Sequence, residues 1–110
     1  GSGGLEVFGT PFMMGLMECA AMQCVQNELP EGKGTVGVEI ASSHLAPTPV
    51  GMKVSATAQV TGISANGKMI TFQVTASDEE GLIGQGTHTR AIIDNARFLQ
   101  KCNEKLAKVQ

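Results

Sequence analysis

The sequence lacks an excess of basic residues. Its 110 residues include 8 Lys and Arg against 10 Asp and Glu, which gives a formal net charge of −2 at pH 7. A protein that wraps nucleic acid normally carries a strong basic excess on at least one face. We therefore expect no nucleic-acid partner, and an anionic ligand would need a local basic patch.

The chain also lacks the cysteine spacing of a disulfide framework. It has 3 cysteines, and an odd number without regular spacing fits free thiols in a reducing compartment. No basic, apolar leader opens the sequence as given, so we expect no secretory signal. We expect the protein to be cytoplasmic.

Motifs for metal and nucleotide chemistry are missing as well. Cys19 and Cys24 are five residues apart on an expected helix and so point to different faces, and only 2 histidines are present. This leaves no zinc site. The chain has no P-loop, no dinucleotide-binding fingerprint and no Gly-x-Ser-x-Gly elbow. We expect no metal and no cofactor.

The first element that the sequence predicts is a helix from Thr10 to about Glu28. Thr is a favourable N-cap, Pro11 suits the first helical position, and residues 29–32 (Leu-Pro-Glu-Gly) close the helix. Apolar side chains cover nearly every face, which indicates a helix enclosed by other structure. The helix is too short and too interrupted by polar residues to span a membrane, so we expect no membrane partner.

Strands follow this helix, because apolar residues then recur at every second position. Such alternation marks residues 36–40, 52–60 and 70–76, and a last strand is expected from about 82 to 93. Asn66-Gly67 and residues 78–81 predict tight turns. These elements predict an α+β fold, in which an antiparallel meander curls around the apolar helix as one domain over residues 1–110.

A short amphipathic helix is expected at the C-terminus. Asp94 is a suitable cap, and four apolar residues then recur at helical spacing: Phe98, Cys102, Leu106 and Val109.

Glu18 is the residue most indicative of chemistry. A carboxylate is rarely placed in an apolar, buried stretch without a partner or a task. The alternative is a surface Glu at a subunit contact or opening. Thr10 has a simpler interpretation as a helix cap, although a capping hydroxyl can also face a ligand.

His44 ends the expected strand 35–43 and precedes a turn rich in proline, and functional groups concentrate at such strand ends. Its alternation with Val36, Val38 and Ile40 predicts that all four share one face. The alternative is a half-buried, hydrogen-bonded histidine.

For His88, inside the last strand, a structural role is favoured. Arg90 could bind an anion, but pairing with a surface carboxylate is favoured.

Five blocks of the sequence together form a specific pattern: Val7-Phe8-Gly9-Thr10-Pro11, Gly15-Leu16-Met17-Glu18, Val36-Gly37, His44-Leu45-Ala46-Pro47-Thr48-Pro49-Val50-Gly51 and Gly84-Gln85-Gly86-Thr87-His88-Thr89-Arg90. Through these blocks the sequence resembles the fluoroacetyl-CoA thioesterase-like family of hot-dog proteins. The match runs from about residue 5 to residue 98. The resemblance implies a hot-dog fold, hydrolysis of a small acyl-CoA thioester, and a homodimer with its sites at the interface.

The resemblance also implies roles for five residues. Thr10, Glu18 and His44 match the family's catalytic set, while Gly37 would lie near the thioester and Arg90 near the coenzyme. Glu18 could act as general base or nucleophile, with Thr10 positioning the attacking species and His44 orienting the carboxylate or supplying a proton. Backbone N–H groups around Gly37 could stabilise the oxyanion.

Two other functions stay open at this point: a non-catalytic acyl-CoA-binding or regulatory protein, and a hydratase or dehydratase acting on acyl thioesters.

One further expectation concerns the spacing of two candidate residues on the helix. Eight residues separate Thr10 from Glu18, so on one helix they lie about 12 Å apart along the axis and roughly 80° apart around it. We therefore expect one site to combine Thr10 of one chain with Glu18 of another.

Overall fold

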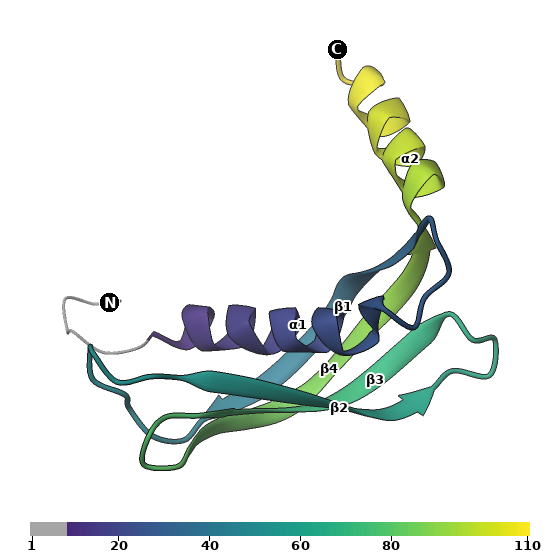
Figure 1. Cartoon of the computed structure of the whole chain (residues 1–110). Coiled ribbons are helices and arrows are strands. Elements are labelled where there is room, and N and C mark those ends of the chain that lie inside the picture. The colour runs from purple at the N-terminus through teal and green to yellow at the C-terminus, as the bar shows by residue number, and fades with distance from the viewer. Residues whose placement is uncertain (1–8) are drawn as a thin grey trace.

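A computed structural model describes residues 9–110, so the glycine-rich start and the Val7-Phe8 part of the first motif block lie outside the described residues. The elements in chain order are α1 (Thr10–Gln26), β1 (Lys33–His44), β2 (Ser55–Ile63), β3 (Met69–Ser77), β4 (Leu82–Asp94) and α2 (Asn95–Ala107). Figure 1 shows one curved sheet with α1 lying across it. The α+β architecture matches the one predicted.

The order of strands in the sheet differs from the predicted meander. Successive strands β2, β3 and β4 are neighbours, but β1 pairs with β4, which gives the order β1-β4-β3-β2. All three pairings are antiparallel. The meander was wrong for β1, because the connection from β1 to β2 passes the ends of β4 and β3 before β2 begins. As a result β1 and β2 are the two edge strands.

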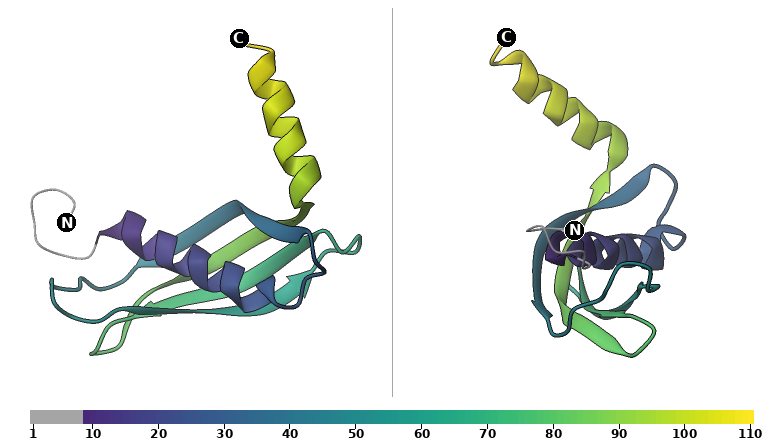
Figure 2. Two further views of the ribbon diagram at one scale, coloured as in Figure 1. Left: turned by 45° about the horizontal axis from the view of Figure 1, so that its top comes forward. Right: turned by 90° about the vertical axis from the view of Figure 1, so that its left-hand side faces the viewer.

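Helix α1 packs on the sheet through one stripe of side chains. Its buried residues are Met13, Met17, Ala21 and Val25, spaced by four, and they meet Phe72 and Val74 of β3 in the core. The prediction of a helix enclosed on most sides was wrong for the single chain. Phe12 is 67% exposed, for example, and the end-on view in Figure 2 shows the sheet curling around only part of the helix. The remaining apolar surface of α1 is uncovered in the described chain.

A β-bulge in β1 changes which side chains face α1. The pairing with β4 shifts register between Gly37 and Glu39, so Gly37 lies opposite Arg90 whereas Ile40 lies opposite His88. A bulge adds one residue to one strand and thereby reverses its alternation. His44 therefore shares a face with Ile40, but the prediction that it also shares one with Val36 was wrong.

The predicted turns and the C-terminal helix are confirmed. Gly67 has a φ of 72° in the turn between β2 and β3, and the Asp78 carboxylate accepts hydrogen bonds from Glu80 N–H and Gly81 N–H before β4. Asp94 caps α2 by accepting a hydrogen bond from Arg97 N–H at 3.0 Å. Helix α2 projects away from the sheet (Figure 1), and none of its residues is buried.

Within residues 9–110, neither helix has the length and apolar character needed to cross a bilayer.

Candidate active site

Thr10 and His44 meet at the start of α1. Thr10 is the first helical residue, and Gly9, not Thr10, occupies the N-cap position without a side-chain cap. The capping interpretation of Thr10 was therefore wrong. Its hydroxyl oxygen lies 2.9 Å from Nδ1 of His44, the last residue of β1. Because Thr10 is exposed and His44 is half-buried, the pair lies at the surface of the chain.

The second ring nitrogen of His44 is left without a partner. Its Nε2 is buried and makes no hydrogen bond within the described residues, and the same holds for the hydroxyl of Ser42, two positions earlier on the same face. Buried polar atoms are normally hydrogen-bonded, so an orphaned one calls for a partner outside the chain. Nε2 is therefore free to exchange a proton with, or bond to, a group that is brought to it.

Glu18 lies two turns further along α1, next to Gly37 of β1. A Cβ atom placed on Gly37 would be 3.3 Å from Oε2 of Glu18, 3.4 Å from Cε1 of His88 and 3.6 Å from Nη1 of Arg90. Glycine at this position thus lets the strand backbone come close to the carboxylate. Three side chains from α1 and β4 converge on one exposed backbone position of β1.

Arg90 is buried, and the prediction that it pairs with a surface carboxylate was wrong. It is 7% exposed. Its Nε donates to the Thr35 hydroxyl at 2.8 Å and its Nη2 donates to the Thr35 carbonyl at 2.9 Å. Burial lowers the pKa of Arg90, and the negative charge of Glu18 nearby acts in the opposite direction. Thr35 holds the guanidinium in place, and the Nη1 atom of Arg90 lies on the side of Glu18 and Gly37.

His88 is held in one orientation behind this group. Its Nδ1 lies 2.7 Å from the carbonyl oxygen of Glu39, which can only accept, so Nδ1 carries a proton. Its Nε2 then accepts from Nη1 of Arg90 at 3.3 Å. The ring is 1% exposed and stacks on Phe72 at a centroid distance of 6.1 Å. These contacts agree with the structural role that the sequence favoured for His88.

The five candidate residues therefore form two groups within one chain. Thr10 and His44 make one group, and Glu18, Gly37 and Arg90 make the other. Since α1 is a continuous helix from Thr10 to Gln26, the spacing of about 12 Å between the backbones of Thr10 and Glu18 holds. No hydrogen bond within residues 9–110 links the two groups.

Comparison with known proteins identifies the family. The sequence pattern of the family described as fluoroacetyl-CoA-specific thioesterase matches residues 1–96. The chain belongs to this family. The fluoroacetyl-CoA thioesterase of Streptantibioticus cattleyicolor is 40% identical over 100 residues, which are 91% of this chain and 70% of that relative. The resemblance inferred from the five motif blocks is confirmed.

Solved structures of the thioesterase family and its neighbours share the fold. A mutant of the fluoroacetyl-CoA-specific thioesterase in complex with fluoroacetate and CoA superposes with a TM-score of 0.87 at 38% identity, covering 94% of this chain and 80% of that one. A hot-dog-like protein from Thermanaerovibrio acidaminovorans gives 0.83 at 25% identity, covering 91% and 73%. The hot-dog fold of the chain is thereby confirmed.

Sequence reasoning did not find Thr35. Its hydroxyl and carbonyl both accept from Arg90, yet a threonine at a strand start has no distinctive pattern of its own. The available indication was register: an arginine inside an apolar strand must satisfy its donors across the sheet if it is buried. That indication required knowing that β1 pairs with β4.

Proposed function

We propose that this thioesterase-family chain hydrolyses the thioester of a small acyl-CoA to the free acid and coenzyme A. The observation that carries this is the Glu18 carboxylate beside the exposed backbone of Gly37, with the Arg90 guanidinium behind it. A carboxylate next to a close-approach backbone position can accept a proton from water, or attack, while the backbone N–H groups face the carbonyl oxygen. The family's named activity supports the reaction class.

Each side chain has a defined part in this reaction. Glu18 acts as general base or nucleophile at the thioester carbonyl. Arg90 keeps a positive charge near the carboxylate and the developing oxyanion, and its contacts with Thr35 and His88 hold it there. The further assignment of Arg90 to the coenzyme stays a prediction.

Thr10 and His44 position the attacking species and handle its proton. A hydroxyl at 2.9 Å from an imidazole nitrogen can be oriented or deprotonated by it. The unpartnered Nε2 of His44 offers a second exchange point, which suits delivery of a proton to the departing thiolate. This differs from an orienting role towards Glu18, because His44 contacts Thr10 within the chain.

The active unit is a homodimer with sites shared between chains. Strand β1 is an edge strand, and edges are commonly covered by a second copy around a two-fold axis. If β1 pairs with its copy in antiparallel about the point between Ile40 and Ala41, the partner's His44 comes alongside Gly37, since antiparallel strands bring opposite ends together. The apolar residues Val38 and Phe12 are 53% and 67% exposed in the single chain. Their exposure supports a second copy covering this surface.

A cytoplasmic location fits the cysteine chemistry. Cys19, Cys24 and Cys102 are free and exposed, and exposed thiols persist in a reducing compartment.

A thiol-release assay over a panel of acyl-CoA thioesters tests the reaction. We expect free coenzyme A to appear catalytically with at least one small acyl group, from acetyl upwards. Saturable binding of acyl-CoA by calorimetry, with no free thiol produced from any member of the panel, would contradict hydrolysis and favour a binding protein. A product retaining the thioester but with water added to or lost from the acyl chain, detected by mass, would favour a hydratase or dehydratase.

A further inference from the structure

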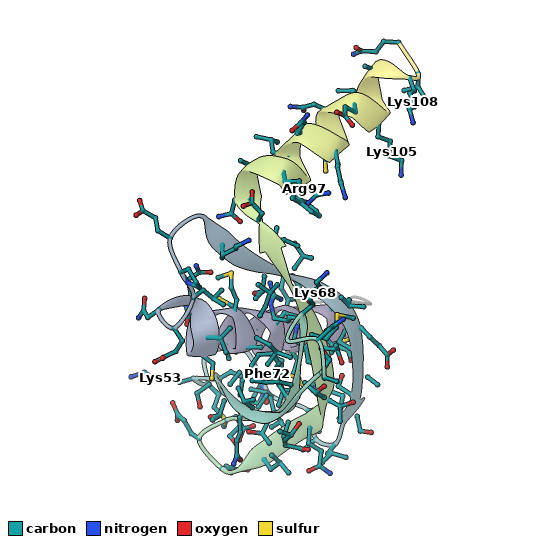
Figure 3. All side chains as sticks on the ribbon, turned by 90° about the vertical axis from the view of Figure 1, so that its right-hand side faces the viewer. Lys53, Lys68, Phe72, Arg97, Lys105 and Lys108 are labelled. Atoms are coloured by element: carbon teal, nitrogen blue, oxygen red, sulfur yellow. The ribbon has the colours of Figure 1, made fainter. Side chains whose placement is uncertain are left out.

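A basic pocket lies where α2 leaves the sheet, at the opposite end of β1 from His44. Four cationic side chains line it: Lys33, Lys68, Arg97 and Lys101. They come from the start of β1, the turn between β2 and β3, and the first half of α2. Half of the eight Lys and Arg residues of a chain with net charge −2 thus gather at one place. Figure 3 shows Lys68 and Arg97 at this junction.

One carboxylate reaches this pocket, and it is already engaged. Asp94 accepts from Arg97 N–H at 3.0 Å through one oxygen and lies 3.6 Å from Lys33 Nζ through the other. Both contacts lower the pKa of Asp94, with the Arg97 N–H contributing most. Within residues 9–110 this is the one ion pair. About three positive charges therefore stay uncompensated, which is the local basic patch that an anionic ligand requires.

The shape and lining of the pocket suit a nucleotide. Its volume of 430 Å³ falls within the range of small-molecule sites. Besides its cations it is lined by Ile92 and by Phe98, whose side chain is 41% exposed. Lys and Arg bind phosphate oxygens by charge-assisted hydrogen bonds, and an exposed aromatic ring offers a stacking surface to a base. The combination fits a phosphate-bearing nucleotide better than a simple anion.

The pocket also lies along the same two strands, β1 and β4, as the candidate active site. Ile92 is two residues beyond Arg90 on the same face of β4, and Lys33 is four residues before Gly37 on β1. Four residues of strand span roughly 13 Å. The pantetheine arm of coenzyme A, which joins the thioester to the phosphates, is long enough to cover that distance.

We infer that the basic pocket binds the phosphorylated nucleotide end of coenzyme A while the thioester lies at Glu18 and Gly37. This inference rests on the proposed function, because it takes the substrate to be an acyl-CoA. It assigns Lys68 and Lys101 to recognition of the carrier and not to the chemical step. It also distinguishes coenzyme A from carriers that lack the nucleotide.

The experiment compares two substrates that share the acyl and pantetheine parts. Acyl-CoA and the matching acyl-pantetheine, which has no nucleotide, are tested with the wild-type protein and with Lys68→Glu and Lys101→Glu. We expect each reversal to raise KM for acyl-CoA by about tenfold, the scale of a lost charge-assisted contact, with kcat unchanged. KM for acyl-pantetheine should not change.

Lys53→Glu is the matched control, since it makes the same charge change at an exposed lysine (Figure 3) that does not line the pocket. It should leave both KM values near those of the wild type. Thermal unfolding of all three variants confirms that they are folded. Equal changes of KM for the two substrates, or no change for either, would overturn the inference.

A separate binding measurement tests the pocket even if the proposed hydrolysis is wrong. Calorimetry with adenosine 3′,5′-bisphosphate reports on the pocket even if neither thioester is hydrolysed by the wild-type protein. We expect it to bind the wild type and the Lys53→Glu variant, and to bind both pocket variants about tenfold more weakly. Binding that is lost in the pocket variants, combined with an unchanged KM for acyl-CoA, would mean a site for free nucleotide and would overturn the assignment to the substrate.

Discussion

The hydroxyl oxygen of Thr10 lies 2.9 Å from Nδ1 of His44, which joins the start of α1 to the end of β1. These two residues therefore act as one unit, and Glu18 belongs to another unit about 12 Å along the helix. If a site uses both units, they come from different chains. Mixing inactive Thr10→Ala and Glu18→Gln proteins by co-refolding should then restore about a quarter of wild-type activity, since half of statistical dimers are mixed and each holds one intact site.

The same pairing supplies a control for the mixing experiment. Thr10→Ala mixed with His44→Ala should recover no activity, because both changes damage the same unit and every site in the mixed dimer is incomplete. His44→Ala mixed with Glu18→Gln should recover as Thr10→Ala does. If mixed dimers are confirmed by mass and none of the three combinations recovers, each chain builds its own site.

Replacing Glu18 by Gln should lower turnover by roughly 10²-fold or more, the usual scale for loss of an acid or base group. The substitution keeps the shape of the side chain and removes its charge and basicity. Glu28→Gln, at an exposed position beyond the end of α1, makes the same chemical change and should leave turnover intact. Full turnover in a folded Glu18→Gln protein would remove the carboxylate from the mechanism.

Gly37→Ala should reduce turnover by about tenfold while the protein stays folded. The new methyl group would be 3.3 Å from Oε2 of Glu18 and 3.4 Å from Cε1 of His88, so the carboxylate must move by a few tenths of an ångström, and catalysis is sensitive to such displacements. Gly62→Ala in β2, where a Cβ meets nothing within 4 Å, is the control. Steady-state kinetics with thermal unfolding curves separates activity from stability.

Thr48→Val should weaken the fold in a pH-dependent way. The buried Thr48 hydroxyl donates to Oδ2 of Asp78 at 2.8 Å, and this is the largest of the contacts that lower the pKa of Asp78. A lowered folded-state pKa stabilises the protein above the ordinary Asp value of about 3.9 and the gain is lost as pH falls through the folded value.

Thermal unfolding between pH 7 and pH 2 checks this expectation. The Thr48→Val protein should melt a few degrees below the wild type at pH 7, and the gap should narrow as the pH falls below about 4. Thr48→Ser, which keeps the hydroxyl, should track the wild type more closely. A gap of constant size at every pH would mean that packing, and not the carboxylate contact, explains the loss.

Local patterns were enough to predict the elements of the fold. The helix from Thr10, the strands, the turn at Gly67 and the Asp94 cap each depend on neighbouring residues. Which strands are neighbours is a long-range property, and the crossing of β1 to β4 had no local pattern to indicate it. Similarly, the bulge between Gly37 and Glu39 reverses the alternation without altering the type of residue in the strand.

The site was predictable in its members more than in its arrangement. Glu18 stood out as a carboxylate in an apolar stretch, and it does lie beside Gly37 and Arg90. The burial of Arg90 could not be predicted, because the long side chain of an arginine reaches water unless a partner such as Thr35 takes its donors. The grouping of His44 with Thr10 follows from the position of β1, which only the strand order supplies.

The pairing of β1 with β4 also constrains when the protein can take shape. Lys33 lies opposite Asp94 and Gly37 opposite Arg90. The hydrogen bonds of β1, an early strand, therefore form only after β4, the last strand, has been synthesised. Until a ribosome has released β4, the nascent chain holds β1 without the strand that joins it to β3. Pairings between distant segments slow folding and leave edges exposed in the meantime. The group of Glu18, Gly37 and Arg90 can therefore assemble only when synthesis is nearly complete. A chain that ends before β4 carries the Glu18 carboxylate without the Arg90 side chain beside it.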